Sequence, residues 1–193
     1  MKNHIKLPVF SLDISVIFLF TLLLIGLQFI NLELAFDRDA IQNGQIWRIW
    51  TGNLVHLNWK HLGMNLVGLW LLIFIFKPYH SICVFFISLF LLITGEALCL
   101  LFFSTGKYYL GLSSSLYGMY LIYATLALRQ KDYFLRLFVL FLLPIKVIWD
   151  YLNSDIKISE SFLNAPIATD AHLYAVGIAS LISLFLFFYK QRI

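Results

Sequence analysis

The sequence predicts an all-α polytopic membrane protein in which six transmembrane helices form one bundle. The chain of 193 residues is 61% hydrophobic and 12% charged, whereas a soluble domain is about half apolar and about a quarter charged. Its mean hydropathy is +0.86. Charge-free apolar runs long enough to span a bilayer recur along its whole length. We therefore expect residues 1–193 to form a single membrane domain, without a separate soluble domain.

The first predicted span is residues 14–32, a run of 19 residues without a charge. It is longer than the apolar core of a signal peptide, and no small-residue cleavage site follows it, so we expect it to remain in the mature protein. Residues 33–55 form a polar connection that contains Trp47 and Trp50. Because tryptophan favours the membrane interface, we expect a membrane-associated loop rather than a free linker.

Five further spans follow, joined by short connections except for a polar loop before the last. They are expected at about residues 59–76, 81–104, 112–129, 133–151 and 172–189. Glu96 falls within the third span, and Arg136 and Lys146 fall within the fifth. Ionisable side chains are costly inside a membrane, so the two basic ones must reach the surface or face protein. For Glu96 we expect a neutral or paired structural group.

The charges between the predicted spans orient the chain. Six spans put both termini on one side, which then has a net charge of +6, against −1 for the other side. The basic residues on the first side are Lys2, Lys6, Lys77, Arg129, Lys131, Arg136, Lys190 and Arg192. Since basic residues favour the cytoplasmic side, both termini are expected in the cytoplasm.

A small, hydroxyl-rich turn opens the fourth span, with Gly111 two residues ahead of Ser113. A serine here can cap the helix or belong to a small-residue packing seam. It can also be a nucleophile if a base lies within hydrogen-bond reach. His172 heads the sixth span at the same depth, and small residues around both positions allow the helices to approach closely. A Ser–His pair is therefore possible, although an intramembrane histidine can equally bond a neighbouring helix.

The start of the second span carries another polar cluster. His61 and Asn65 are four residues apart and so share one helix face, and His56 precedes them. Side chains of this kind can donate hydrogen bonds to the oxyanion that develops in acyl transfer. They can also form interhelical hydrogen bonds. Both interpretations agree with the spacing.

A zinc site formed by His56, His61 and His172 is a competing interpretation. The His-Glu-x-x-His motif is absent, and no acid stands beside the histidines to act as a base. His56 and His61 are five residues apart, which directs them apart on a regular helix. We therefore expect no metal and no cofactor. Asp170 is expected to be an exposed loop acid rather than the third member of a catalytic triad.

Taken in order, these motifs resemble those of rhomboid intramembrane serine proteases. The matching elements are Trp47-Arg48, His56-x4-His61-x3-Asn65, Gly111-Leu112-Ser113 with Tyr117, and Ala171-His172. The resemblance covers nearly the whole chain and implies a six-transmembrane-helix, rhomboid-like bundle. The stretch from Gln42-Asn43-Gly44-Gln45 through Trp47-Arg48 to Thr51, with His56-Leu57-Asn58-Trp59, is most similar to the rhombosortase branch.

The resemblance implies a role for each matching residue. Ser113 would be the nucleophile and His172 its general base, a dyad without a carboxylate. His61 and Asn65, with the Ser113 backbone N–H, would form the oxyanion hole. Tyr117 would stack against His172. The other supporting residues would be Gly111 beside the nucleophile, His56 bracing the start of the second span, and Trp47 and Arg48 anchoring the loop.

Three positions depart from the family pattern. Ser114 stands where a glycine usually follows the serine, and Ala175 stands where many rhomboids have glycine. Rhombosortases often carry histidine at the position of Tyr117, where the general rhomboids carry tyrosine.

The resemblance implies an intramembrane serine endopeptidase that cleaves membrane-anchored proteins at or near the outer membrane surface, including C-terminal Gly-Gly-type anchoring tails. It implies a location in the bacterial inner (cell) membrane. The expected partners are the lipid bilayer and a protein substrate, and no nucleic acid. A catalytically silent rhomboid-like protein that binds membrane clients is the alternative. A small transporter is disfavoured because the sequence has no inverted repeat or broken helix pair.

Overall fold

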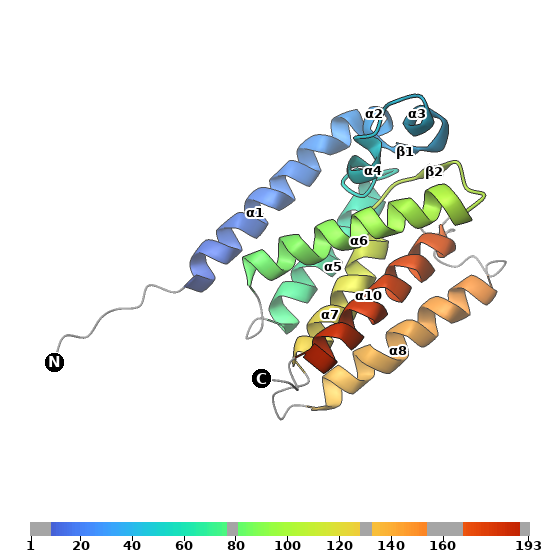
Figure 1. Ribbon diagram of the computed structural model, residues 1–193. Coiled ribbons are helices and arrows are strands. Elements are labelled where there is room, and N and C mark those ends of the chain that lie inside the picture. Colours follow the sequence, from blue (N-terminus) through green and yellow to red (C-terminus); the bar gives the residue numbers. More distant parts are fainter. Residues whose placement is uncertain (1–8, 77–80, 128–132, 154–167, 190–193) are drawn as a thin grey trace.

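The computed structural model describes residues 9–76, 81–127, 133–153 and 168–189 (Figure 1). Nearly all regular structure in these residues is helical, so the predicted all-α class is confirmed. The six longest helices are α1 (Val9–Leu27), α5 (Trp59–Ile75), α6 (Ile82–Phe103), α7 (Ser113–Ala127), α8 (Tyr133–Leu152) and α10 (Thr169–Tyr189).

Three segments of the described chain are long and apolar enough to cross a membrane: Asp13–Leu34, Ile82–Phe103 and Thr169–Phe188. Helix α5 is also apolar but has only 17 residues. Large apolar side chains face outward, as at Phe102 and Phe103, which are 74% and 75% exposed. Soluble proteins rarely expose contiguous apolar surface of this kind. The fold is therefore a multi-pass membrane bundle, and the number of six spans stays a prediction.

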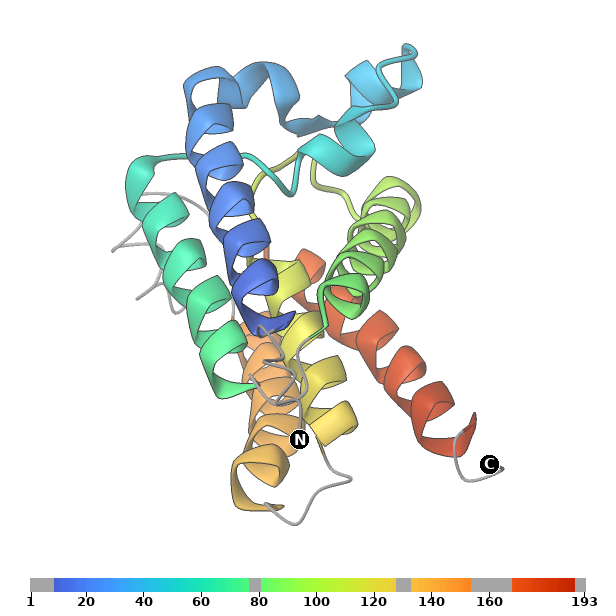
Figure 2. The same ribbon diagram turned by 90° about the vertical axis from the view of Figure 1, so that its left-hand side faces the viewer.

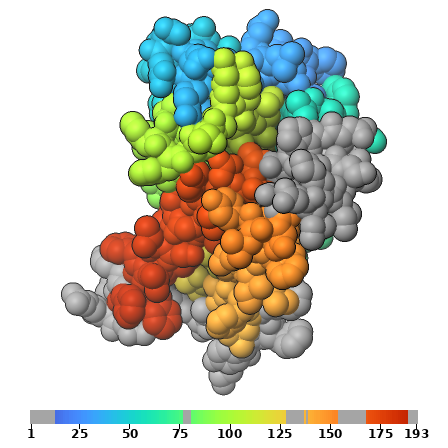
Figure 3. Space-filling view, turned by 90° about the vertical axis from the view of Figure 1, so that its right-hand side faces the viewer, coloured from blue at the N-terminus to red at the C-terminus, as the bar shows by residue number. Residues whose placement is uncertain are grey.

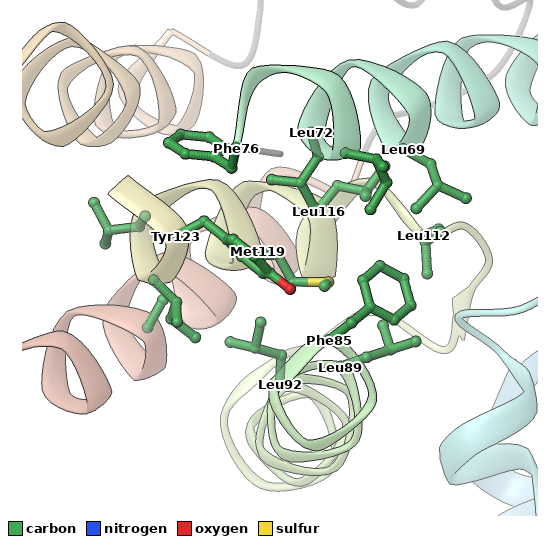
Figure 4. Close-up of a cluster of buried hydrophobic side chains, with 14 of the residues drawn as sticks. Leu69, Leu72, Phe76, Phe85, Leu89, Leu92, Leu112, Leu116, Met119 and Tyr123 are labelled. Atoms are coloured by element: carbon green, nitrogen blue, oxygen red, sulfur yellow. The ribbon is translucent and has the colours of Figure 1, made fainter. Parts of the chain in front are cut away.

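Helix α7 occupies the centre of the bundle, where it contacts α5, α6, α8 and α10. Figure 2 shows it between α5 on one side and α6 and α10 on the other. In Figure 4, Met119 and Tyr123 of α7 lie between Leu72 of α5 and Leu92 of α6. All four side chains are fully buried. The absence of charge from α7 fits this central position.

Helix α1 ends earlier than the first predicted span. It stops at Leu27 and is continued by a 3-10 turn, η1 (Gln28–Ile30), and by the short helix α2 (Asn31–Leu34). The side-chain amides of Gln28 and Asn31 both donate to the backbone carbonyl of His56, at 2.9 and 2.8 Å. These bonds tie the end of the helix to the segment ahead of α5, which accounts for the interruption.

Residues 33–55 fold into short elements at one end of the bundle (Figure 1). These are β1 (Phe36–Asp37), α3 (Arg38–Gln42) and α4 (Arg48–Thr51). Strand β1 pairs in antiparallel fashion with β2 (Tyr108–Tyr109), where the sequence predicts only a loop. Lys107 forms an ion pair with Asp39 of α3, with an N–O distance of 2.5 Å. The segment 33–55 is therefore joined to the segment that leads into α7.

Most of the charges that orient the chain lie outside the described residues. These are Lys2, Lys6, Lys77, Arg129, Lys131, Lys190 and Arg192. The cytoplasmic location of both termini therefore remains a prediction.

Candidate active site

The first turns of α7 and α10 bring Ser113 and His172 together. Ser113 is the first residue of α7, and His172 lies three residues after the start of α10. Ser113 Oγ lies 2.8 Å from His172 Nε2. The histidine is buried, whereas Ser113 is partly exposed. For the hydroxyl to donate, Nε2 must be unprotonated, which is the form that a general base needs.

Small residues allow α7 and α10 to approach closely beside this pair. A Cβ added at Gly118 would lie 3.2 Å from the carbonyl oxygen of Ala175 and 2.7 Å from Leu92 Cδ2. Ala175 is itself fully buried. The backbone of α10 at Ala175 therefore lies against Gly118, where little room is left for a side chain.

Tyr117, one turn after Ser113, contacts His172. The two ring centroids are 4.9 Å apart and the ring planes meet at 63°, an edge-to-face contact rather than a stack. Lys146 of α8 has its Nζ 5.4 Å from the Tyr117 ring centroid and forms an ion pair with Asp150. Helices α8 and α10 lie side by side on the face shown in Figure 3. The lysine within the fifth predicted span therefore has an ionic partner and an aromatic neighbour next to His172.

Gly111 lets the chain turn into α7 and lies against the ring of His61. Its φ is +124°, a conformation that favours glycine. A Cβ at this position would lie 2.6 Å from His61 Cε1 and 2.8 Å from Nε2. Any other residue would have to displace the ring. Since Gly111 is two residues before Ser113, the same contact holds the His61 imidazole near the Ser113 backbone.

His56 packs against His61 and holds the next peptide. The two imidazole centroids are 5.2 Å apart, and the Leu112 backbone N–H donates to His56 Nε2 at 3.4 Å. Burial, with the nearby His61 as a smaller cause, lowers the pKa of His56 to about 3. Nε2 is therefore an unprotonated acceptor. The proton lies on Nδ1, which has no hydrogen-bond partner among the described residues.

Asn65 lies one turn after His61 on α5 and is buried. Its Nδ2 donates to the carbonyl oxygen of His61 at 3.0 Å. A primary amide has two N–H donors. Among the described residues this is the one hydrogen bond of the Asn65 amide, so its second N–H can donate to a ligand.

Trp47 and Arg48 have different surroundings in the loop. Trp47 is 48% exposed, whereas Arg48 donates from Nη1 to the Ala35 carbonyl oxygen at 2.7 Å. Bonds from the loop to α6 come instead from Trp50, whose Nε1 donates to Thr94 Oγ1 at 3.0 Å, and from Arg38, whose guanidinium donates to a backbone carbonyl oxygen of α6 at 2.5 Å. Arg48 therefore joins parts of the loop to each other, and Trp50 and Arg38 join the loop to α6.

The two serines that follow Ser113 face a separate polar cluster. Ser114 Oγ lies 2.6 Å from Glu96 Oε2 and 2.6 Å from the hydroxyl of Tyr109. Ser115 Oγ donates to Asn53 Oδ1 at 2.9 Å. We call these five residues, all of them buried, the Glu96 cluster. The sequence indicates Glu96 as an unexplained acid, but it carries no local signal for Asn53 or Tyr109.

Tyr109 connects this cluster to the turn before α7. Its hydroxyl donates to the Gly111 carbonyl oxygen at 2.6 Å. Burial raises the pKa of Tyr109 well above its usual range, so the hydroxyl keeps its proton. The cluster is therefore bonded directly to the residue that leads into α7.

Asp170 is not the exposed loop acid that the sequence predicts. It lies in the first turn of α10, is partly buried and accepts a hydrogen bond from Ser104 Oγ. An acid is favourable at this end of a helix, which explains why α10 begins before His172. In the part of the chain that the structure describes, no group of three or more His, Cys, Asp or Glu residues is placed to hold a metal ion.

Comparison with known proteins identifies one family. The family model described as Rhomboid domain matches residues 43–189. No curated protein matches the sequence. The matched region begins ahead of α4 and ends with α10, so it contains every residue of the candidate site.

Proposed function

Because the chain belongs to the rhomboid family, we propose that it is an intramembrane serine endopeptidase. Ser113 is the nucleophile and His172 is its general base, a dyad without a carboxylate. The observation that carries the proposal is the distance of 2.8 Å between Ser113 Oγ and His172 Nε2. At this distance the imidazole can take the hydroxyl proton.

In the proposed reaction, His172 Nε2 takes the Ser113 proton as Oγ attacks the scissile carbonyl carbon. The tetrahedral intermediate collapses when His172 gives that proton to the leaving amine, so the peptide bond breaks and an acyl ester of Ser113 remains. Water, deprotonated by His172, then attacks the ester; the bond from the acyl carbon to Ser113 Oγ breaks, Oγ takes the proton back from His172, and the acid is released. The edge-to-face contact with Tyr117 limits rotation of the imidazole during these transfers.

We assign the oxyanion hole to the Ser113 backbone N–H, His61 and Asn65. The close contact between Gly111 and the His61 ring supports this assignment, because it keeps the imidazole near the Ser113 backbone. The free N–H of Asn65 supports it as well. His56 supports this arrangement in two ways: it packs against the His61 ring, and it accepts a hydrogen bond from the Leu112 N–H next to Ser113.

We further propose six spans in the bacterial inner membrane, with both termini in the cytoplasm. The positive-inside charge distribution supports this orientation, and the exposed Trp47 supports a loop that lies in the membrane interface. Single cysteines at positions 107 and 129, in a variant lacking Cys83 and Cys99, should react from opposite sides of the membrane. Labelling of both from the same side would contradict this topology.

The proposed substrate is a membrane-anchored protein whose anchor enters the site sideways from the lipid. The resemblance to rhombosortases narrows this to C-terminal Gly-Gly-type anchoring tails. Co-expression with a reporter carrying such a tail should release the reporter, whereas a tail with Leu-Leu in place of Gly-Gly should not be cut. Equal cleavage of both tails would contradict this narrower assignment.

A serine-directed activity probe tests the proposed function without a known substrate. Wild-type protein should be labelled, and Ser113→Ala should not. Ser114→Ala is the matched control, because it removes the same hydroxyl one residue further along and should stay labelled. A folded wild-type protein that takes no label would instead favour a catalytically silent rhomboid-like protein that binds membrane clients.

A further inference from the structure

The Glu96 cluster contains an ionisable group that the proposed reaction does not use. Glu96 is fully buried in α6, and neither ion pair among the described residues includes it. Its Oε1 has no hydrogen-bond partner in the same part of the chain. A buried carboxylate without a counter-charge and with one oxygen unpaired is very costly, above all inside a membrane.

Hydrogen atoms can be counted along a chain of four oxygen atoms that runs from this cluster to Gly111. Glu96 Oε2, Ser114 Oγ, Tyr109 OH and Gly111 O follow one another at distances of 2.6 Å each. Each of these three short distances requires one hydrogen between its two oxygens. The two hydroxyls supply two hydrogens, and the carbonyl supplies none. The third hydrogen must therefore belong to the Glu96 carboxyl group.

Ser115 does not supply the missing hydrogen. Its hydroxyl donates to Asn53 Oδ1 at 2.9 Å and lies 3.5 Å from Glu96 Oε2. A hydrogen from Ser115 would in any case point at Oε2 and would not enter the gap between Ser114 and Tyr109.

We propose that Glu96 is a neutral carboxylic acid and a positioning residue for Ser113. Glu96 donates to Ser114, Ser114 donates to Tyr109, and Tyr109 donates to the carbonyl oxygen of Gly111. The effect on Ser113 rests on the proposed function, whereas the protonation of Glu96 does not.

This chain of hydrogen bonds ends at the peptide group between Gly111 and Leu112. Tyr109 holds its carbonyl at 2.6 Å, and His56 holds its N–H at 3.4 Å. A peptide fixed at both ends sets the direction of the next one, which carries the Ser113 N–H assigned to the oxyanion hole. If Glu96 were ionised, the Ser114 hydrogen would point at Glu96, and the single Tyr109 hydrogen could not serve both Ser114 and Gly111. The neutral acid therefore keeps the Tyr109 hydroxyl on Gly111.

Infrared spectroscopy tests the protonation directly. At neutral pH, the difference between wild type and Glu96→Gln should contain the carbonyl band of a protonated carboxylic acid, shifted in D2O. A difference that contains only carboxylate bands would overturn the proposal. This measurement needs no substrate, so it gives an answer even if the protein cleaves nothing.

Kinetics test the positioning role. Glu96→Gln keeps a donor at the same place, and its kcat should stay within about threefold of wild type. Glu96→Leu has a similar size but leaves Ser114 without a donor, so the Ser114 and Tyr109 hydroxyls are no longer held in line with Gly111. Its kcat should fall by about tenfold to a hundredfold with KM unchanged, since a misplaced oxyanion donor affects the transition state more than the bound substrate. Equal kcat values for the two variants would show that Glu96 does not position the site.

A second variant tests the positioning role even if Glu96→Leu does not fold. Tyr109→Phe removes the hydroxyl link to Gly111 and should lower kcat to a similar extent. Ser115→Ala is the control, because it removes a neighbouring buried hydroxyl that lies outside the chain, and it should keep its kcat. Loss in Ser115→Ala equal to that in Tyr109→Phe would overturn the positioning role. A wild-type protein without activity would contradict the proposed function alone, and the infrared result would still decide the protonation of Glu96.

Discussion

The first turn of α7 separates two polar regions with similar chemistry and different surroundings. On one side, the partly exposed Ser113 faces His172. On the other side, the fully buried Ser114 and Ser115 face Glu96 and Asn53. Successive residues of a helix turn by about 100°, so three consecutive serines cannot share one partner. The comparison shows that a base within reach and an open approach mark the reactive hydroxyl, whereas burial commits the other two to internal hydrogen bonds.

The largest expected effect separates Ser113 from its neighbours. Ser113→Ala should lower cleavage of a membrane-anchored reporter by at least about 10³-fold, because the nucleophile is lost. Ser114→Ala should lose no more than about a hundredfold, because it breaks the hydrogen-bond chain from Glu96 to Gly111 but keeps the nucleophile. Near-normal cleavage by Ser113→Ala with loss in Ser114→Ala would reverse the roles of the two regions.

The next effect concerns the donors on the exposed side. His61→Ala and Asn65→Ala should each lower turnover by about 10²–10³-fold while the fold stays intact, since each removes one oxyanion donor. Steady-state kinetics with a thermal melt of each variant checks this. Losses below about threefold in both variants would mean that the two residues serve packing instead.

A smaller effect concerns stability, at the buried His56 that packs against His61. Its pKa is about 3 in the folded protein, against 6.5 as its ordinary value. The unfolded state therefore binds more protons between these values, so stability is lost as the pH falls through this window. We expect His56 to account for about 2 kcal/mol of the stability lost between pH 7 and pH 5.

Unfolding in detergent micelles at the two pH values measures this contribution. His56→Gln cannot be protonated in this range and should lose correspondingly less stability on acidification. The same pH dependence in wild type and His56→Gln would show that another group is responsible.

The smallest effect concerns Ser115. Ser115→Ala should lower the free energy of unfolding by about 1 kcal/mol, because it leaves Asn53 Oδ1 without its hydrogen-bond donor. Turnover should remain close to that of wild type. A loss of turnover without a loss of stability would mean that the boundary between the two regions lies one residue further along α7.

The apolar runs of the sequence are enough to locate most of the helices. The five later long helices start and end within three residues of the ranges predicted for the later spans. The end of α1 could not be predicted in the same way, because Gln28 and Asn31 bond to His56, which lies 28 and 25 residues away. The pairing of β1 with β2 escapes prediction for the same reason, since each strand has only two residues and depends on the other.

The two polar regions also differ in how far the sequence indicates them. Regular spacing on one helix places His61 and Asn65 on one face, and equal depth brings Ser113 near His172. The Glu96 cluster combines residues from the loop before α5, from α6, from β2 and from α7, and no spacing rule connects these segments. The sequence places Asp170 in a loop because the apolar run of the last span begins after it, whereas the helix begins at Thr169.

The contact between Gly118 and Ala175 has a consequence for how closely the reacting atoms can be adjusted. It lies about 7.5 Å along α7 from Ser113, and there the backbone of one helix meets the other without a side chain between them. A long side chain can change rotamer to absorb a shift, but a backbone carbonyl cannot. The spacing of the two helices, and with it the gap between Ser113 and His172, therefore depends on the absence of a single methyl group at position 118. A substitution at position 118 would thus change the distance between the reacting atoms while leaving both reacting residues unchanged.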